Sequence, residues 1–294
     1  MDTLAQLKDR LHAAAYVASD EIVQALRAAL VLGRPLLVEG PPGVGKTLIA
    51  HALSRLLEAP LIRIQCYEGI GPEQLLYDYN HAKQLLFISL LRDRVQQHLS
   101  DHSLGEAIRE LDREAGAFWG REFLLRRPLL EAIDPADGRQ RVLLIDEVDK
   151  TEADAEALLL EVLSEYTVSI PEYGTVRASQ RPVVVLTGNR SRELSEALRR
   201  RCVYLYLDYP DRRTEAAILA LHVPEADPEY RERVVEAVQR LRRLKLRQPP
   251  AVAEAIDVLR LLVGAHGAGW LHTLAKHPED RDAIRRAGID LGPD

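Results

Sequence analysis

The chain has 294 residues, of which 47% are hydrophobic and 29% are charged, which is enough apolar material for one large core and a smaller second one. No apolar run reaches the length of a membrane span, and the first residues lack the basic and apolar regions of a signal peptide, so we expect a cytoplasmic protein without a membrane partner. The net charge of -6 argues against a dedicated nucleic-acid partner. Cys66 and Cys202 have no Cys or His at metal-ligand spacing, and both are expected to be buried.

Two amphipathic helical patterns open the chain. Leucines at helical spacing predict a helix over 4–11, and a second apolar stripe predicts one over 22–30. Ser19 is a suitable N-cap for the second helix, and Gly33 is a suitable stop. The apolar run over 35–39 is then interpreted as a short strand that is buried on both faces.

This strand leads into a glycine-rich loop of the form G-x-x-x-x-G-K-T, which is typical of proteins that bind nucleoside triphosphates. Glycines allow backbone torsions that turn N–H groups inward as an anion-binding nest, and the helix predicted over 46–58 adds the positive end of its dipole. Lys46 can reach the β- and γ-phosphates, and the hydroxyl of Thr47 can bind Mg²⁺. A surface turn rich in Gly and Pro would rarely fall between such a strand and such a helix. The predicted nucleotide-binding residues are Gly40, Pro41, Pro42, Gly43, Val44, Gly45, Lys46, Thr47 and Leu48.

Further buried strands are predicted over 61–65, 142–146, 183–187 and 203–207, with helical stretches between them. Strands that alternate with helices imply right-handed crossovers. The predicted fold is therefore α/β, with a doubly wound parallel sheet of the P-loop NTPase type.

The interval between the strands over 61–65 and 142–146 is too long for a simple crossover, so we expect a helical insertion over about 80–135. An amphipathic pattern predicts a long helix over 82–99, and a short helix is predicted over 128–133. Ser103 and Glu106 form a capping box that would begin another helix.

Strand signals end at Leu207, and the rest of the chain shows only helical patterns separated by prolines. The predicted helices cover 214–221, 230–246, 251–263 and 265–276. We therefore expect a nucleotide-binding core over 1–208 and a small all-α lid domain over 209–294. The basic run over 240–247 is interpreted as a solvated helix face rather than a nucleic-acid site.

The strand over 142–146 ends in two carboxylates, Asp146 and Glu147, which is the Walker B pattern. Asp146 would bind Mg²⁺, mostly through its water shell, and Glu147 would polarise the water that attacks the γ-phosphate. Acidic pairs are common in turns, so this pair indicates a Walker B site only because a phosphate loop precedes it in the sequence. Asn189 follows the next predicted strand, where its side-chain amide could lie beside the γ-phosphate. The structural alternative is that this asparagine only allows a left-handed turn after Gly188.

Three consecutive arginines, Arg199, Arg200 and Arg201, stand between a predicted helix and the last strand. Phosphoryl transfer needs a cation near the γ-phosphate, and an arginine from a neighbouring subunit can supply it. Three adjacent side chains cannot all point in one direction, so some are expected to be solvated or paired with Glu193 and Glu196. A basic triplet by itself is more often a solvated face.

In order and spacing these motifs resemble those of AAA+ ATPases. The motifs that carry the resemblance are the phosphate loop over 40–47, the Walker B strand over 143–147, the sensor-like Asn189 and the Arg-Arg-Cys at 200–202. The segments 124–132 and 189–198 are similar to the MoxR family. The segments 64–69 and 253–257 resemble its branch associated with carbon monoxide dehydrogenase and the maturation of other molybdenum hydroxylases.

This resemblance implies a homo-oligomeric ring, usually a hexamer, with ATP and Mg²⁺ at the subunit interfaces. It also implies a chaperone-like role for a client metalloenzyme, together with a partner that carries a von Willebrand factor A domain. By this resemblance Arg201 matches the arginine finger, Arg200 is the second candidate for it and Arg199 is a weaker one. The expected catalytic residues are therefore Glu147, Asn189, Arg201, Arg200 and Lys46. Many AAA+ proteins carry a sensor-2 arginine early in a lid helix, and this chain has none over 248–253, which leaves Arg247 and Arg260 as substitutes.

The sequence thus predicts a MoxR-type AAA+ ATPase that hydrolyses ATP to remodel a partner protein. One alternative is a nucleotide-dependent assembly scaffold with little hydrolysis, which the joint presence of Glu147, Asn189 and Arg201 disfavours. The other is a nucleic-acid-stimulated motor, which the acidic balance disfavours. The base of the nucleotide is placed only loosely, near Tyr16 and Val17 and the hinge over 207–210.

Overall fold

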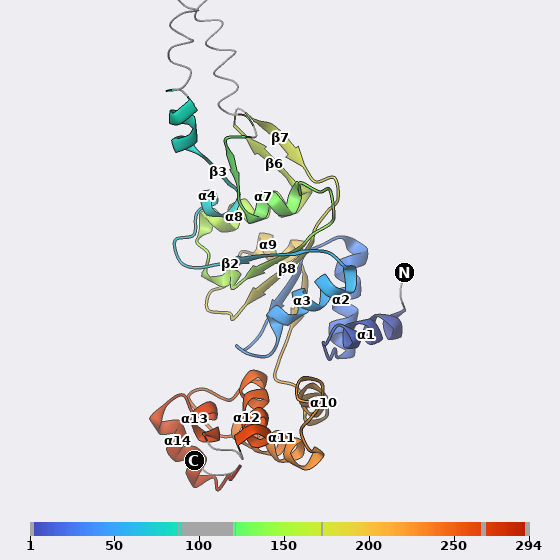
Figure 1. Ribbon diagram of the computed structural model, residues 1–294, viewed down its shortest axis with the longest axis vertical. Coiled ribbons are helices and arrows are strands. Elements are labelled where there is room, and N and C mark those ends of the chain that lie inside the picture. Colours follow the sequence, from blue (N-terminus) through green and yellow to red (C-terminus); the bar gives the residue numbers. More distant parts are fainter. Residues whose placement is uncertain are drawn as a thin grey trace, which may run out of the picture.

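A computed structural model describes residues 3–87, 89, 120, 122–171, 173–265 and 269–291 of the chain (Figure 1). In these residues the central sheet has five strands, all parallel, in the order β2-β5-β8-β1-β9. The strands are β1 (Leu36–Glu39), β2 (Leu61–Gln65), β5 (Val142–Asp146), β8 (Val183–Gly188) and β9 (Val203–Tyr206). The predicted doubly wound parallel α/β fold is confirmed, and each predicted strand lies within a residue or so of its observed bounds.

Both faces of the sheet are buried because alternate residues of each strand enter two different cores. Leu36 and Val38 of β1 pack into one core, whereas Leu37 packs into the other. The first core is closed by the helices α1 (Leu4–Ala13), α2 (Asp20–Leu32) and α3 (Lys46–Leu57). The second core is closed by α7 (Pro128–Ile133), α8 (Ala153–Glu165) and α9 (Glu196–Arg201). The continuous apolar strands of the sequence follow from this two-sided burial.

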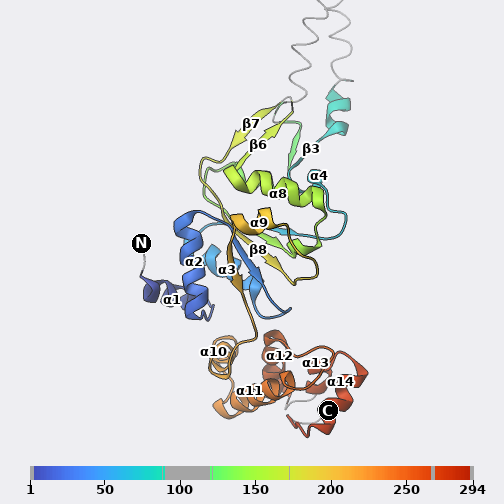
Figure 2. The same ribbon diagram turned by 180° about the vertical axis from the view of Figure 1, so that it is seen from behind.

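The interval between β2 and β5 contains more than helices, which corrects the expected helical insertion. The short helix α4 (Pro72–Leu75) precedes β3 (Tyr77–Tyr79), which pairs antiparallel with β4 (Leu124–Arg126). A second antiparallel pair, β6 (Thr167–Ile170) with β7 (Gly174–Arg177), lies near it at the end of the molecule away from the C-terminal helices (Figures 1 and 2). The predicted helix over 82–99 is seen over 81–87, and most of its remainder, with the helix expected after Ser103, lies outside the described residues.

From Arg212 onward the described residues form helices and no strand. They are α10 (Arg212–His222), α11 (Pro228–Arg242), α12 (Val252–Ala265), α13 (Trp270–Leu274) and α14 (Pro278–Arg286), the last of which was not predicted. These helices share a core of their own, which lies below the sheet in Figure 1. Within the described part of the chain no helix has both the length and the apolar character needed to cross a membrane.

The basic run over 240–247 is exposed, as expected, at Arg240, Arg243, Lys245 and Arg247, but α11 ends at Arg242 and the side chain of Arg242 is buried. The Arg242 guanidinium forms a two-pronged ion pair with Glu215, with Nη2–Oε1 and Nη1–Oε2 distances of 2.6 and 3.0 Å. Glu215 is fully buried, and Arg242 also stacks on the ring of Tyr209, 4.6 Å from its centroid. This basic side chain therefore holds the helices to the segment that joins them to the sheet.

Candidate nucleotide-binding site

The phosphate loop connects the buried end of β1 to the first turn of α3. Gly45 adopts a left-handed conformation (φ 96°) as the N-cap of α3, and Gly43 is also left-handed (φ 74°). A Cβ at Gly40 would lie 2.0 Å from the carbonyl oxygen of Leu207, and one at Gly43 would lie 2.4 Å from Cβ of Ala251. Glycine is therefore required at both positions by close approach of other chain segments, and Ala251 brings the C-terminal helices against the loop.

Lys46 is buried at the start of α3 and joins the loop to β8. Its Nζ donates to the carbonyl oxygens of Gly40 and Pro41, each at 2.7 Å, and to Oδ1 of Asn189 at 2.8 Å. Burial lowers the pKa of the Lys46 ammonium, and the nearby carboxylates Asp149, Asp146 and Glu147 oppose this effect. The predicted phosphate-binding lysine and the predicted sensor asparagine are thus in direct contact.

Oxygen ligands suited to Mg²⁺ meet at the carboxyl end of β5. The Thr47 hydroxyl donates to Oδ1 of Asp146 at 3.2 Å, and the Thr187 hydroxyl donates to the same oxygen at 2.5 Å. A carboxylate and a hydroxyl fit a small, hard cation that keeps several of its waters, so Asp146 and Thr47 could hold Mg²⁺. The other oxygen of Asp146 accepts from Nη2 of Arg63 at 2.7 Å, so a cationic side chain already neutralises this carboxylate.

Glu147 has a left-handed backbone (φ 57°), which is uncommon for a residue with a side chain. Its N–H donates to the hydroxyl of Thr187 at 3.0 Å. Its Oε2 lies 2.6 Å from Nζ of Lys150 and accepts from Nε2 of Gln65 at 3.1 Å. Its Oε1 lies 3.5 Å from Nδ2 of Asn189. The candidate base therefore lies beside Asn189 but is held by two further side chains.

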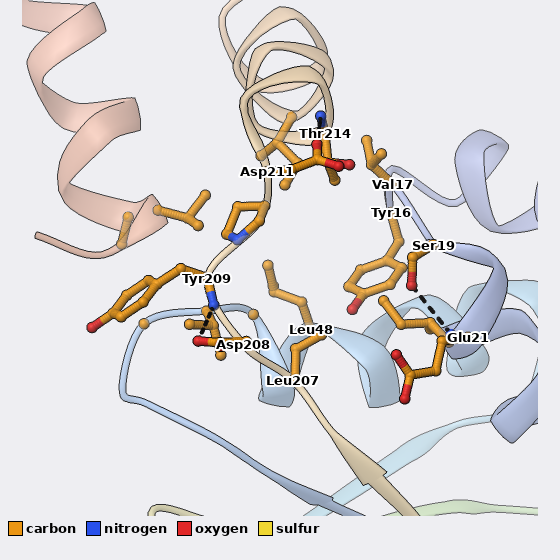
Figure 3. A pocket seen from close by; sticks show the side chains of 18 of the residues that line it. Tyr16, Val17, Ser19, Glu21, Leu48, Leu207, Asp208, Tyr209, Asp211 and Thr214 are labelled. Carbon is orange, nitrogen blue, oxygen red and sulfur yellow. Dashed lines mark hydrogen bonds between the residues drawn. The ribbon is translucent and has the colours of Figure 1, made fainter. Parts of the chain in front are cut away.

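Two neighbouring cavities share Gly43 and Gly45 of the phosphate loop. The first, of about 370 Å³, is lined by Lys46, Asp146, Glu147 and Asn189 and also by Arg63 and Gln65. The second, of about 430 Å³, lies between the N-terminal segment, α3, the hinge after β9 and the C-terminal helices. Figure 3 shows Tyr16 and Val17 on one side of it, Asp208 and Tyr209 on the other, and Leu48 with Leu207 between them.

The polar cavity suits a triphosphate, and the second cavity, with its many apolar side chains, suits a purine base and its sugar. The expected base position near Tyr16, Val17 and the hinge over 207–210 falls in the second cavity. Neither Arg247 nor Arg260 is among the described residues that line either cavity.

The three arginines at the end of α9 have three different environments. Arg199 pairs with Glu39 through Nη1 and Oε1 at 2.8 Å, and Arg200 pairs with Glu196 one turn earlier on the exposed surface. Arg201 is exposed, donates only to the carbonyl oxygen of Ala197 at 3.4 Å, and makes no ion pair in the described part of the chain. None of the three is among the described residues that line the polar cavity, so the fold does not bring Arg200 or Arg201 to the site of their own subunit.

Several site residues were not predicted from the sequence. Arg63 and Gln65 reach the site from β2, and the alternation Leu61-Ile62-Arg63-Ile64-Gln65 was the signal, because it places both polar side chains on one face at the carboxyl end of a strand. Asp149 was also missed. Its Oδ2 accepts from the backbone N–H groups of Asn189 and Ser191 at 3.0 and 2.8 Å and so fixes the loop that carries the predicted sensor asparagine.

Comparison with known proteins agrees with this geometry. Residues 35–202, more than half of the chain, match the AAA domain family of the dynein-related subfamily. The chain therefore belongs to this AAA family, whose P-loop fold binds nucleotides, usually with Mg²⁺, and in general hydrolyses ATP. AAA+ proteins of this fold commonly assemble into rings.

Two relatives resemble most of the chain. The chain is 27% identical over 235 residues to the gas vesicle ATPase GvpN of Haloferax mediterranei. The matched region covers 74% of this chain and 59% of that protein. The chain is 27% identical over 251 residues to the denitrification regulatory protein NirQ of Pseudomonas aeruginosa, which covers 85% and 82% of the two chains. Among solved structures, a RuvB point mutant from Thermotoga maritima is 17% identical with a TM-score of 0.48, covering 99% of this chain and 72% of that one.

Proposed function

We propose that this chain is an ATP-hydrolysing AAA+ protein of the MoxR family, which works as a ring and uses the energy of hydrolysis to remodel a partner protein. The observation that carries the proposal is that Lys46, Glu147 and Asn189 line one cavity with Asp146, while Arg201 stays outside it. A scaffold that only binds nucleotide has no need for a carboxylate placed beside the sensor asparagine. The site therefore favours hydrolysis over passive binding.

Within one subunit, ATP would place its phosphates on the loop, where backbone N–H groups and the N-terminus of α3 stabilise negative charge. Lys46 would exchange its two carbonyl partners for phosphate oxygens and remain beside Asn189. Thr47 and Asp146 would hold Mg²⁺, which neutralises charge on the β- and γ-phosphates. Arg63 would then share Asp146 with the metal or release it, because both are cations at one carboxylate.

Glu147 would polarise the attacking water, and Asn189 would help to orient it, since these two side chains approach each other from adjacent strands. To act on the water, the carboxylate oxygen Oε2 of Glu147 must first leave Lys150, whose Nζ occupies it at 2.6 Å. Hydrolysis would therefore depend on a local rearrangement of Lys150 and Gln65 around Glu147.

Among the described residues that line the polar cavity, the cations are Lys46 and Arg63, and Arg63 is paired with Asp146, so none of them is left for the far side of the γ-phosphate. Arg201 is exposed, and the described residues offer it no acidic partner, so we assign it as the arginine finger of the neighbouring subunit in a ring, usually a hexamer. Arg200 would support it. Such a division of the site would make activity depend on assembly.

The partner is proposed from the sequence resemblance and from the relatives. One relative is named a gas vesicle ATPase and the other a denitrification regulatory protein, which supports action on another protein or system. The segments 64–69 and 253–257 support the branch associated with carbon monoxide dehydrogenase and molybdenum hydroxylases. We therefore propose a client metalloenzyme in the cytoplasm and a partner with a von Willebrand factor A domain.

The proposed activity is tested by measuring phosphate release from Mg·ATP by the purified protein, with Glu147→Gln as the matched control. Steady release that disappears in Glu147→Gln supports hydrolysis at this site, whereas nucleotide binding without release would favour the assembly scaffold. A clear increase on adding single- or double-stranded DNA would instead favour a nucleic-acid motor. A partner retained by Glu147→Gln in the presence of ATP, and released by the unaltered protein, would identify the client.

A further inference from the structure

A buried carboxylate that the proposed mechanism does not use lies next to the phosphate loop. Glu39 is the last residue of β1, directly before Gly40, and it is only 2% exposed. An ionised carboxylate is costly to bury unless cations and hydrogen bonds compensate it. The partners of Glu39 therefore indicate what its charge stabilises.

Within the described residues, the side-chain partners of Glu39 come from the part of the chain that follows β8. Arg199 donates to Oε1 and Oε2 at 2.8 and 3.4 Å, and the hydroxyl of Tyr204 donates to Oε2 at 3.0 Å. Nε of Arg190 lies 3.9 Å from Oε2. The Arg199 guanidinium also stacks on Tyr204, 5.0 Å from its ring centroid. The carboxylate thus holds α9 and β9 and contacts the loop after Asn189.

The sheet fixes the backbone of Glu39 independently of this carboxylate. Glu39 is in register with Gly188 of β8 and Tyr206 of β9, and its carbonyl oxygen accepts from the N–H of Leu207 at 2.7 Å. Loss of the carboxylate charge would therefore leave the start of the phosphate loop in place. The element that depends on the side chain is α9.

The helix α9 has only six residues. The N–H of its N-cap Ser195 donates to Glu156 at 2.7 Å, and two side chains then hold the middle of the helix. Leu198 is buried in the core on one side of the sheet, and the next residue, Arg199, reaches Glu39. Arg200 and Arg201 follow directly and are exposed. Because a rotation of α9 about Ser195 and Leu198 would move Arg201, the ion pair of Arg199 with Glu39, two residues from Arg201, restrains where Arg201 points.

We propose that Glu39 is a positioning residue that sets the orientation of α9 through Arg199, so that its effect falls on the ATP site of the neighbouring subunit and not on its own. This inference rests on the proposed ring with shared sites. It assigns Arg199 to its own subunit and leaves Arg201 as the residue presented to the neighbour. It predicts that Glu39 and Lys46, seven residues apart in one segment, serve two different active sites.

The first measurement is the steady-state kinetics of Glu39→Gln, which keeps the shape and removes the charge. We expect kcat to fall by about 10²-fold, the effect of misplacing a catalytic group by about 1 Å, with KM and the nucleotide Kd unchanged. Glu193→Gln, the same chemical change on an exposed residue before α9, is the matched control and should leave the rate unchanged. An unchanged rate in Glu39→Gln, or loss of nucleotide binding, would overturn the proposal.

The decisive measurement mixes subunits, with mixed rings verified by mass spectrometry. Rings of Glu39→Gln with Lys46→Ala should regain activity, because a Lys46→Ala subunit offers an intact α9 to the intact nucleotide site of its neighbour. Rings of Glu39→Gln with Arg201→Ala should stay inactive, because every site then lacks a correctly placed arginine. The reverse pattern would mean that Glu39 acts on the phosphate loop of its own subunit, and it would overturn the proposal.

Two controls distinguish a failure of the proposed role of Glu39 from a failure of the proposed active site shared between subunits. Rings of Arg201→Ala with Lys46→Ala must regain activity, and failure here would refute the shared site and the role of Glu39 with it. If Glu39→Gln does not fold, Arg199→Gln takes its place, since that side chain is partly exposed. Arg199→Gln should then regain activity with Lys46→Ala and not with Arg201→Ala, and the opposite result overturns the proposal.

Discussion

Lys46 Nζ and Asn189 Oδ1 lie 2.8 Å apart although 143 residues separate them in the sequence. The contact joins the first turn of α3 to the end of β8, and Glu147 reaches the same asparagine from β5. Three elements thus contribute one polar group each to a common point, at the carboxyl edge of a parallel sheet where α/β proteins bind their ligands.

Substitution of the two charged residues of this group, Lys46 and Glu147, should have different effects. Lys46→Ala should lose nucleotide binding, because it removes the cation that is proposed to neutralise the β- and γ-phosphates. Glu147→Gln should keep binding and lose turnover by about 10²-fold or more, since general base catalysis contributes on that order. Calorimetry with ATP and measured phosphate release would separate the two. Equal loss of ATP binding in both variants would contradict the assigned roles.

Lys150 should restrain hydrolysis by holding Glu147. Its ammonium lies 2.6 Å from Oε2 of Glu147, and hydrogen bonding with that carboxylate raises the pKa of Lys150. We expect Lys150→Gln to increase the basal rate of ATP hydrolysis by about twofold to fivefold, the size of effect typical of an exposed ion pair. Single-turnover phosphate release at saturating ATP measures this step. A slower rate in Lys150→Gln would show that Lys150 supports catalysis instead.

The activity of the unaltered protein should rise with its concentration if Arg201 completes a neighbouring site. Arg201→Ala should lower kcat by about 10³-fold, or about 4 kcal/mol of barrier, the low end of the range for arginine fingers. Nucleotide affinity should change little, because Arg201 does not line the polar cavity of its own subunit as described. Specific activity measured across the assembly transition, followed by light scattering, tests this. A rate per subunit that is independent of concentration through that transition would place the whole site in one subunit.

The C-terminal helices should depend on the buried pair of Glu215 with Arg242. Glu215→Ala leaves a buried guanidinium without its partner and should lower the free energy of unfolding by about 3–5 kcal/mol. Asp257→Ala breaks an exposed pair with Arg260 and should cost less than about 1 kcal/mol. Urea denaturation followed by circular dichroism compares the two. Similar losses in both variants would show that burial does not determine the strength of the Glu215 pair.

The two cysteines should be unreactive in the folded protein. Burial raises the pKa of the Cys66 and Cys202 thiols to about 12, so almost no thiolate exists at pH 8. Iodoacetamide should therefore label both thiols slowly in the native protein and rapidly in denaturant, which mass spectrometry can follow. Rapid labelling of either thiol in the native protein would show that it is not buried.

The same thiols make stability fall at alkaline pH. The pKa values of these thiols in the folded protein lie above the unfolded value of about 8.5, so the unfolded chain loses its thiol protons at lower pH than the folded protein does. The contribution of the thiols to the free energy of unfolding is therefore lost as pH rises from about 8.5 towards 12. Each thiol should cost about 2 kcal/mol between pH 8.5 and pH 10. Cys66→Ala should show a smaller decrease in the free energy of unfolding over that range. An equal decrease in the variant would mean that the Cys66 thiol does not contribute.

The sequence alone predicted the elements that depend on local patterns. The strand that contains Val38, the glycine-rich loop after it and the helix that begins at Lys46 could be placed because apolar runs, glycines and capping residues act over a few positions. Ser19 and Gly33 bound α2 as expected for the same reason. The antiparallel pair of β3 with β4 could not be predicted, because its two strands lie 45 residues apart in the sequence and have only three residues each, too few for an alternating pattern to identify a strand.

The candidate site divides in the same way. The sequence by itself predicted which residues would bind phosphate, bind Mg²⁺ and polarise water, because Lys46, Asp146 and Glu147 belong to motifs with fixed spacing. Only the tertiary structure decided what holds them: Arg63 on Asp146, Lys150 on Glu147, and Glu39 on Arg199. Ion pairs between distant segments depend on how strands are ordered and registered in the sheet, and no local pattern of residues encodes that order. The environments of the three adjacent arginines therefore became distinguishable only once α9 was packed against the sheet.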